Sequence, residues 1–381
     1  MRAALTHGRV LTDRGAVEDR AVVVEDGRIA GLVRQSDVPA GYETHALNGH
    51  LLVPGFIDTQ VNGGGGVLFG DAPSIESLRT ISHAHAQFGT TAFLPTLISG
   101  TLDLIRAAID AVDAAIEAKV PGIAGIHIEG PFLNPARRGI HDDANFRKLD
   151  AEALALLASA KHGKTMVTLA PEQTTPDMVQ ALVRSGVIVS CGHTDATYRE
   201  TWAALEAGAT GFTHLFNAMS PLKAREPGAV GAALDHTPSW AGIIVDGHHV
   251  DPATLRVALA AKKAARLMLV TDAMPSVGAA YKDFVLQGRH IAVQDGVCRG
   301  PDGTLAGSDL DMASALRNSM KFLGVDLNEA SAMASRNPAA FLGLGDEMGS
   351  IRNGQRANFV LLDDALEVRG VWIDGHPQRR P

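Results

Sequence analysis

Histidine and carboxylate side chains stand at the ends of several short apolar runs in the chain. Four of them form a candidate site: Glu129, His193, His214 and Asp272. Imidazole and carboxylate groups around a divalent metal ion suit amide hydrolysis, because the ion lowers the pKa of a bound water and polarises the carbonyl while a carboxylate moves protons. A single histidine in such a position is more often a packed or solvated residue. Together, the four residues predict a metal-dependent hydrolase.

Other residues of the same types are interpreted differently. His83 and His85 have the His-x-His spacing of a metal site, but they lie in a helical pattern, where residues two apart point in different directions. We therefore expect neither to bind a metal ion. Cys191 is interpreted as a buried structural thiol. Glu172, which follows another apolar run, could support the site residues from behind or be a polar residue of the rim, and it is not included among the predicted site residues.

Short apolar runs alternate with amphipathic helical patterns through most of the chain. The runs cover residues 51–53, 91–94, 125–128, 166–169, 187–190, 211–214, 242–245 and 267–270. The helical patterns cover residues 74–88, 102–119, 151–161, 176–185 and 252–264, the last with Asp251 as N-cap and Pro252 as first residue. Runs that are apolar on both faces are typical of buried parallel strands. Eight strands with helical crossovers predict an α/β fold, a TIM-like (β/α)8 barrel, with an open doubly wound sheet as the alternative.

The two chain ends and one insertion indicate β structure outside this barrel. Residues 1–50 and residues 346–381 contain short strands around tight turns. Neither end alone could bury a core, so we expect them to pair into one small β domain beside a barrel of residues 51–345. Residues 284–298 predict a hairpin inserted after the eighth strand. Because barrel active sites lie at the carboxyl ends of the strands, the four candidate residues would share one rim.

Composition limits the class of protein further. The chain has 381 residues, 46% of them hydrophobic and 20% charged, with a formal net charge of −8. This balance gives no support for nucleic-acid binding, because phosphate backbones need a basic surface. No apolar run reaches the roughly 18 residues of a membrane span, and the first residues lack a signal-peptide pattern. Two cysteines cannot make a disulfide framework, which favours a soluble cytoplasmic protein.

Six motifs follow one another along nearly the whole sequence. They are PGFID at 54–58 with Gln60-x-Asn62-Gly63, HIEGPF at 127–132, GHTDA at 192–196, THLFNAM at 213–219, VTDAM at 270–274 and TLAGS at 304–308. Together they resemble the N-acetylglucosamine-6-phosphate deacetylase family of the amidohydrolase superfamily. The first motif alone would indicate only a relative of the amidohydrolases.

The resemblance implies a (β/α)8 barrel with a small β-sandwich domain formed by both chain ends. It implies a hydrolase that acts on a linear amide C–N bond in amino sugar catabolism, converting N-acetyl-D-glucosamine 6-phosphate to D-glucosamine 6-phosphate and acetate. N-acetylgalactosamine 6-phosphate, which differs at one hydroxyl, is the alternative substrate. A non-catalytic relative that keeps the barrel for binding is a third hypothesis, but such a protein would be expected to lose site residues that this chain retains.

The family motifs also imply residue roles. Glu129, His193 and His214 would hold the catalytic metal, while Asp272 would act first as base toward the metal-bound water and then as acid toward the leaving amine. The remaining matches would contact the substrate: Gln60, Ile140, His141, Asn217, Ala218, Arg225, His249, Leu305, Ala306 and Gly307.

Arg225 and His249 suit the phosphate group, because a guanidinium fork and an imidazole can neutralise and orient a dianion. The family arranges its phosphate contacts at a dimer interface. We therefore expect a homodimer in which these two residues serve the neighbouring subunit's site.

The segment Gln60-Val61-Asn62 stands where many amidohydrolases carry His-x-His. Amide side chains are poor ligands for a zinc-class ion compared with imidazole. We therefore expect one divalent ion per subunit, with zinc as the first choice and iron, manganese or cobalt as alternatives. Gln60 would instead form hydrogen bonds within the site.

Overall fold

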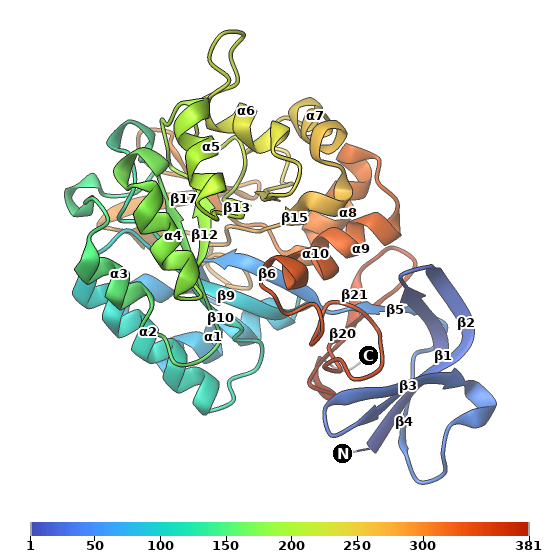
Figure 1. Ribbon diagram of the computed structural model, residues 1–381. Coiled ribbons are helices and arrows are strands. Elements are labelled where there is room, and N and C mark those ends of the chain that lie inside the picture. The colour runs from blue at the N-terminus through green and yellow to red at the C-terminus, as the bar shows by residue number, and fades with distance from the viewer. Residues whose placement is uncertain (1, 380–381) are drawn as a thin grey trace.

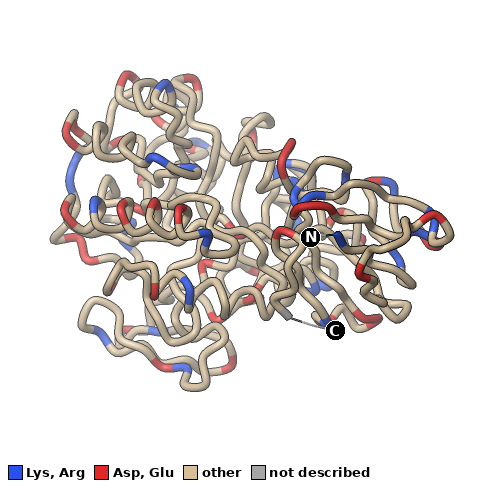
Figure 2. Tube along the Cα trace, turned by 90° about the horizontal axis from the view of Figure 1, so that it is seen from below, with Lys and Arg blue, Asp and Glu red and all other residues tan. Residues whose placement is uncertain are grey.

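The computed structural model describes residues 2–379, which form a barrel of strands and helices beside a smaller β domain (Figure 1). Residues 1 and 380–381, which belong to the expected small domain, lie outside the described residues. Basic and acidic residues are interspersed along both parts (Figure 2). Within residues 2–379, no helix combines the length and apolar character that crossing a membrane would need.

Both chain ends contribute strands to one eight-stranded sheet, as predicted. The strands are β1 Arg2–Thr12, β2 Gly15–Glu25, β3 Arg28–Arg34, β4 Glu43–Ala46, β5 Leu51–Pro54, β20 Phe359–Leu362, β21 Val368–Ile373 and β22 His376–Arg379. β5 joins the two ends, because it pairs in parallel with β1 and antiparallel with β20. The β2–β3 hairpin turns at Asp26 and Gly27, whose φ angles of 47° and 78° suit a tight Asp-Gly turn. Phe359 and Trp372 fill the core of this domain.

Eight parallel strands form the barrel and follow one another in chain order. They are β6 Phe56–Val61, β9 Thr90–Ile98, β10 Gly125–Glu129, β11 Lys164–Leu169, β12 Ile188–Cys191, β13 Gly211–Phe212, β14 Trp240–Ile243 and β15 Leu267–Leu269. Two hydrogen bonds join the first barrel strand to the segment just after the last one. The Thr271 hydroxyl donates to Asp58 Oδ2 at 2.5 Å, and the Asp272 N–H donates to Gln60 O at 3.0 Å. Burial raises the pKa of Asp58 to about 7. The predicted barrel is therefore confirmed.

One predicted strand was assigned to the wrong sheet. Residues 51–53, expected as the first barrel strand, belong to β5 of the small sheet, and the first barrel strand is β6. A short apolar run is buried in either position, so hydrophobicity does not distinguish the two sheets. The chain passes from one to the other at Gly55, where a Cβ would lie 2.1 Å from Thr91 Oγ1. As a result, Gln60 lies within the first barrel strand rather than in a loop after it.

Helices surround the barrel (Figure 1). They are α1 Ile75–Ala86, α2 Leu102–Glu117, α3 Ala151–Leu157, α4 Pro176–Arg184, α5 Tyr198–Glu206, α6 Gly228–Asp235, α7 Pro252–Lys262, α8 Met312–Leu323, α9 Leu327–Ala334 and α10 Arg336–Phe341. The five helices predicted from the sequence are confirmed, and Asp251 caps α7 by accepting the Ala253 N–H at 2.7 Å. On α1, His83 is exposed while His85 is buried with its Nε2 2.8 Å from Gly63 O, so the two point apart.

The inserted hairpin is part of a four-stranded antiparallel sheet. Its strands are β16 Phe284–Leu286, β17 Arg289–Gln294, β18 Val297–Arg299 and β19 Leu305–Ser308. The minor elements are the β7 Gly63–Gly64 and β8 Val67–Leu68 pair and the 3-10 turns η1 Gln35–Asp37, η2 Phe69–Asp71, η3 Pro135–Arg137, η4 Asp143–Asn145, η5 Pro171–Gln173 and η6 Ala264–Arg266. Leu305, Ala306 and Gly307, the predicted substrate contacts of the glycine-serine motif, lie on β19.

Lys262, at the end of α7, stabilises the end of α6. Its side chain is buried, and Nζ donates to Ala233 O at 2.8 Å, His236 O at 3.0 Å and Ser239 Oγ at 3.1 Å. We expect Lys262→Met to lower the free energy of unfolding by about 1–3 kcal/mol, because the buried Ala233 carbonyl and the Ser239 hydroxyl lose this donor. Urea unfolding measures the change. Lys263→Met, at the exposed neighbouring position, is the matched control, and equal effects of the two substitutions would contradict this role.

Candidate metal centre

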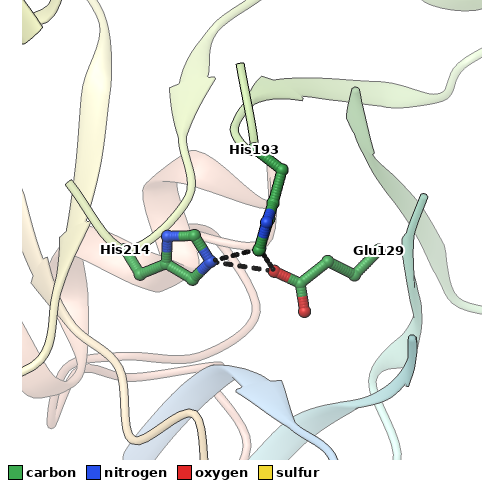
Figure 3. Close-up of side chains that lie close together, drawn as sticks. All are labelled: Glu129, His193 and His214. Atoms are coloured by element: carbon green, nitrogen blue, oxygen red, sulfur yellow. Dashed lines mark hydrogen bonds and ion pairs between the residues drawn. The ribbon is translucent and has the colours of Figure 1, made fainter. Parts of the chain in front are cut away.

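Three buried side chains from three strand ends converge on one point (Figure 3). Glu129 is the last residue of β10, His193 follows β12 by two residues, and His214 follows β13 by two residues. His214 Nε2 lies 3.0 Å from both Glu129 Oε1 and His193 Nε2, and His193 Nε2 lies 3.3 Å from Glu129 Oε1. The structure therefore brings together the three residues that the family motifs assigned to the metal.

The chemistry of these donors fits a divalent cation. His193 Nδ1 is 2.9 Å from the carbonyl oxygen of Arg137. A carbonyl can only accept, so Nδ1 carries the proton and the lone pair of Nε2 faces His214 and Glu129. Two imidazoles and one carboxylate are the ligand set of an open catalytic site, which leaves a fourth position for water or substrate.

Two carboxyl groups with opposite electrostatic environments lie side by side in this centre. Burial by itself opposes ionisation of Glu129, but the His193 and His214 imidazoles hold its pKa well below the usual range. Burial and the charge of Glu129 raise the pKa of Asp272 to about 6. A carboxyl group that titrates near neutrality can both take up and return a proton, as general acid–base catalysis requires.

Gln60 and Asn62 fix the two carboxylates. Gln60 Nε2 donates to Glu129 Oε1 at 3.1 Å, to Glu129 Oε2 at 3.2 Å and to Asp272 Oδ1 at 3.1 Å. Asn62 Nδ2 donates to Asp272 Oδ1 at 2.7 Å. The amide of Gln60 thus bridges Glu129 and Asp272, where it supplies hydrogen-bond donors instead of the lone pair that a second metal ion would need.

The backbone is left-handed at three of the site residues. The φ angles of His193, His214 and Asp272 are 47°, 34° and 54°. Residues with side chains rarely adopt this region, and such conformations persist where the surrounding structure holds them, commonly at functional sites. Each strand end therefore turns sharply enough to direct its side chain into the centre.

A cavity of about 260 Å³ opens onto the metal centre. Seven of the predicted substrate contacts line it: Ile140, His141, Asn217, Ala218, His249, Leu305 and Gly307. Three predicted contacts do not: Gln60 is buried beside the ligands, Ala306 is fully buried on β19, and Arg225 is exposed on the loop before α6. The cavity therefore gathers the metal centre and most of the predicted substrate contacts in one space.

The two additional histidines of the cavity have defined hydrogen-bond partners. The Ser99 N–H donates to His141 Nδ1 at 3.4 Å, and the Ser99 hydroxyl oxygen lies 2.8 Å from the same atom. Because a backbone N–H can only donate, Nδ1 accepts and the proton of that ring lies on Nε2. Burial, reinforced by His193, lowers the pKa of His141 to about 3, which keeps the ring neutral. His249 Nδ1 lies 2.5 Å from Asp246 Oδ2, and this hydrogen bond lowers the pKa of Asp246 to about 2 despite its burial.

Sequence reasoning missed the residues that orient the site rather than form it. Asp246 precedes His249 by three residues, and Ser99 follows β9, so their position at strand ends was the available signal. His127 was quoted within a motif but given no role. It lies two residues before Glu129, and on a strand this spacing puts both side chains on the same face. Such spacing could have identified it.

Comparison with known proteins agrees with this geometry. Residues 51–377 match the Amidohydrolase family, and residues 3–52 match the NagA composite domain. The chain is similar to an N-acetylgalactosamine-6-phosphate deacetylase of Shewanella sp. (strain ANA-3), with 44% identity over 96% of this chain and 93% of that protein. It is 34% identical to an N-acetylglucosamine-6-phosphate deacetylase of Haemophilus influenzae, over 98% and 99% of the two chains. The crystal structure of N-acetylglucosamine-6-phosphate deacetylase from Pasteurella multocida matches with a TM-score of 0.95 and 33% identity over 99% of both chains.

We expect about one tightly bound divalent ion per chain, because Glu129, His193 and His214 form one open site and Gln60 bridges the two carboxylates. His193→Ala and His214→Ala should each abolish tight binding, whereas His83→Ala, on the exposed face of α1, should not. Metal analysis after dialysis measures the content. A stoichiometry near two, with anomalous scattering from an ion beside Gln60 or Asn62, would contradict this expectation.

Proposed function

Because this chain belongs to the amidohydrolase family, we propose that it hydrolyses the acetamide of N-acetyl-D-glucosamine 6-phosphate to give D-glucosamine 6-phosphate and acetate. The observation that carries this proposal is the convergence of Glu129, His193 and His214 with Asp272 adjoining them, in a chain that covers nearly the full length of relatives with this activity. Release of acetate from the sugar phosphate is the direct test.

N-acetylgalactosamine 6-phosphate is the second candidate substrate. The 44% identical relative from Shewanella acts, by its name, on this sugar, which differs from the first at one hydroxyl. Comparing kcat/KM for the two sugar phosphates and for their unphosphorylated forms distinguishes the candidates and tests whether the phosphate is required.

Each residue of the centre has a separate role in amide hydrolysis. A divalent ion held by Glu129, His193 and His214 would act as a Lewis acid toward the carbonyl and lower the pKa of water. Asp272 accepts a proton from the attacking water and then donates it to the nitrogen of the leaving amine. Gln60 and Asn62 keep its Oδ1 in place through their amide donors. The neutral Nε2–H of His141 supplies a further donor in the cavity.

Zinc is the metal that this ligand set favours, because two imidazoles and one carboxylate match its tetrahedral preference. Iron, manganese and cobalt also accept imidazole and carboxylate ligands, so they remain alternatives.

The protein would act as a homodimer. The loop between β13 and α6 projects from the barrel (Figure 1) and carries the exposed Arg225 and Leu222. Leu222 and Val257, each 55% exposed, border an apolar hollow formed with Phe216 and Leu234. Pairing of two chains through this face would cover the apolar surface and bring Arg225 of the partner subunit toward the substrate phosphate.

His249 lines the cavity of its own chain, so we assign it to that chain's phosphate rather than to the neighbour's, contrary to the expectation from the family motifs.

Asp272→Asn should lower kcat by about 10² or more, because the amide keeps the size of the carboxyl but cannot accept the proton. Metal content should stay at the parent level, since Asp272 is not one of the three ligands. Steady-state kinetics on metal-replete protein make the measurement. Undiminished turnover in that variant would refute the assignment.

Arg225→Ala should raise KM strongly for the phosphorylated substrate and change the kinetics of the unphosphorylated sugar little, because only interactions with the phosphate are lost. Lys223→Ala, on the same exposed loop, is the control for a general charge effect. Sedimentation at assay concentrations accompanies the kinetics. A fully active monomer, or equal losses on both substrates, would remove Arg225 from this role.

A further inference from the structure

The carboxylate of Glu172 joins the two loops that enclose His193. Glu172 lies in η5, just after β11, between the loop after β10 and the loop after β12. Its oxygens accept three hydrogen bonds, from Asn134 Nδ2 at 2.8 Å, from Thr194 Oγ1 at 2.5 Å and from the Asp195 N–H at 2.7 Å. One side chain thus holds both loops, and the proposed chemistry gives it no task.

Both loops also hold His193 directly. The Asn134 N–H donates to the carbonyl oxygen of His193 at 3.0 Å, and the Nδ1–H of His193 donates to Arg137 O at 2.9 Å. Gly139 packs on the ring, since a Cβ there would lie 3.3 Å from His193 Cε1. The direction of the ring therefore depends on where the loop after β10 is placed.

An ion pair closes these contacts into a ring. The Asp195 carboxylate accepts from the Arg137 guanidinium at 2.8 Å, while the Asp195 N–H is held by Glu172. Glu172 binds the Asp195 N–H, the Asp195 carboxylate binds Arg137, and Arg137 O binds His193 Nδ1. The ring closes through Thr194, the residue after His193, whose hydroxyl donates to Glu172. Removing Glu172 opens this ring and leaves the two loops joined by the Arg137–Asp195 ion pair and by the contacts of His193 with Asn134 and Arg137.

His193 needs such support because its backbone is in a disfavoured conformation. Its φ of 47° lies in the left-handed region, and a non-glycine residue stays there only when its surroundings fix it. The same backbone turn aims Nε2 at Glu129 and His214. A small rotation of this segment would move one of the three ligand atoms away from the other two.

We propose that Glu172 is a positioning residue for the metal ligand His193, tying the loops after β10 and β12 together so that Nδ1 stays on Arg137 O and Nε2 stays directed into the metal centre. This inference rests on the proposed metal-dependent function. Glu172 itself touches neither the ligand atoms nor the cavity, since its partners are Asn134, Thr194 and Asp195.

The test is Co²⁺ binding to the metal-stripped, full-length protein, measured by competition with a chromogenic chelator. Glu172→Ala should weaken binding by about 10- to 100-fold, as loss of groups that orient a ligand typically does. The visible absorption spectrum of the Co²⁺ protein should also change, because the geometry at His193 changes. Glu172→Gln keeps one carbonyl oxygen for Asn134 and Asp195, so it should restore part of the affinity and of the parent spectrum.

Asp177→Asn, at an exposed carboxylate on α4, is the matched control and should behave as the parent. A lower melting temperature for Glu172→Ala with unchanged Co²⁺ affinity and spectrum would show a purely structural role and overturn the proposal. If Glu172→Ala fails to fold, the Glu172→Gln and Asn134→Ala variants replace it in the test. Unaltered Co²⁺ affinity and spectrum in both of these variants would also overturn the proposal. Acetate release by the parent is measured in parallel: its absence refutes the proposed function, while the Co²⁺ data still decide the role of Glu172.

Discussion

The close approach of two imidazole nitrogens and a carboxylate oxygen is the constraint on which the rest of the structure depends. His193 Nε2, His214 Nε2 and Glu129 Oε1 lie within 3.3 Å of one another in a buried position. Burying such groups costs free energy unless each finds a hydrogen-bond partner or a cation. A backbone carbonyl and a neutral amide supply partners to His193 Nδ1 and to Glu129, whereas His214 Nδ1 has none among the described residues. A bound metal ion would be the cation that compensates the three converging ligand atoms.

A polar layer supports the ligands from within the barrel. His127 lies 3.1 Å from Thr96 Oγ1 and 2.7 Å from Thr168 Oγ1, and the Thr168 hydroxyl lies 2.6 Å from that of Thr213. Burial lowers the pKa of His127 to about 4, so the ring stays neutral there. Barrel interiors are usually filled by branched apolar side chains. Here hydrogen bonds connect the strand that carries Glu129 with the strand that leads to His214, which limits relative movement of the two ligands.

The sequence predicts the ligands well because parallel strands all end at one rim, so polar residues after apolar runs must converge. It predicts less about the groups that hold them. The contact between Asp58 and Thr271 joins the first and last barrel strands and leaves no periodic signal. The sequence does not distinguish Glu172 from any other polar residue that follows a strand, so its hydrogen bonds to the two loops could not be predicted. The misplaced run at 51–53 shows a related limit, since apolar character predicts burial but not the sheet in which a strand lies. Arg225 matches a family motif, yet it lies outside the cavity of its own chain.

The pairing of β5 with β20 has a consequence for the order in which the chain can fold during synthesis. Leu51 pairs with Leu362, so this edge of β5 stays unpaired until the segment around residue 362 has left the ribosome. By then the metal ligands and Asp272 have long been available to meet. An open, apolar strand edge invites pairing with other chains, and contacts between distant segments form slowly. The nascent protein is therefore exposed to aggregation at the unpaired edge of β5, and a chain cut short before β20 would keep a complete set of metal ligands beside a sheet with that edge uncovered.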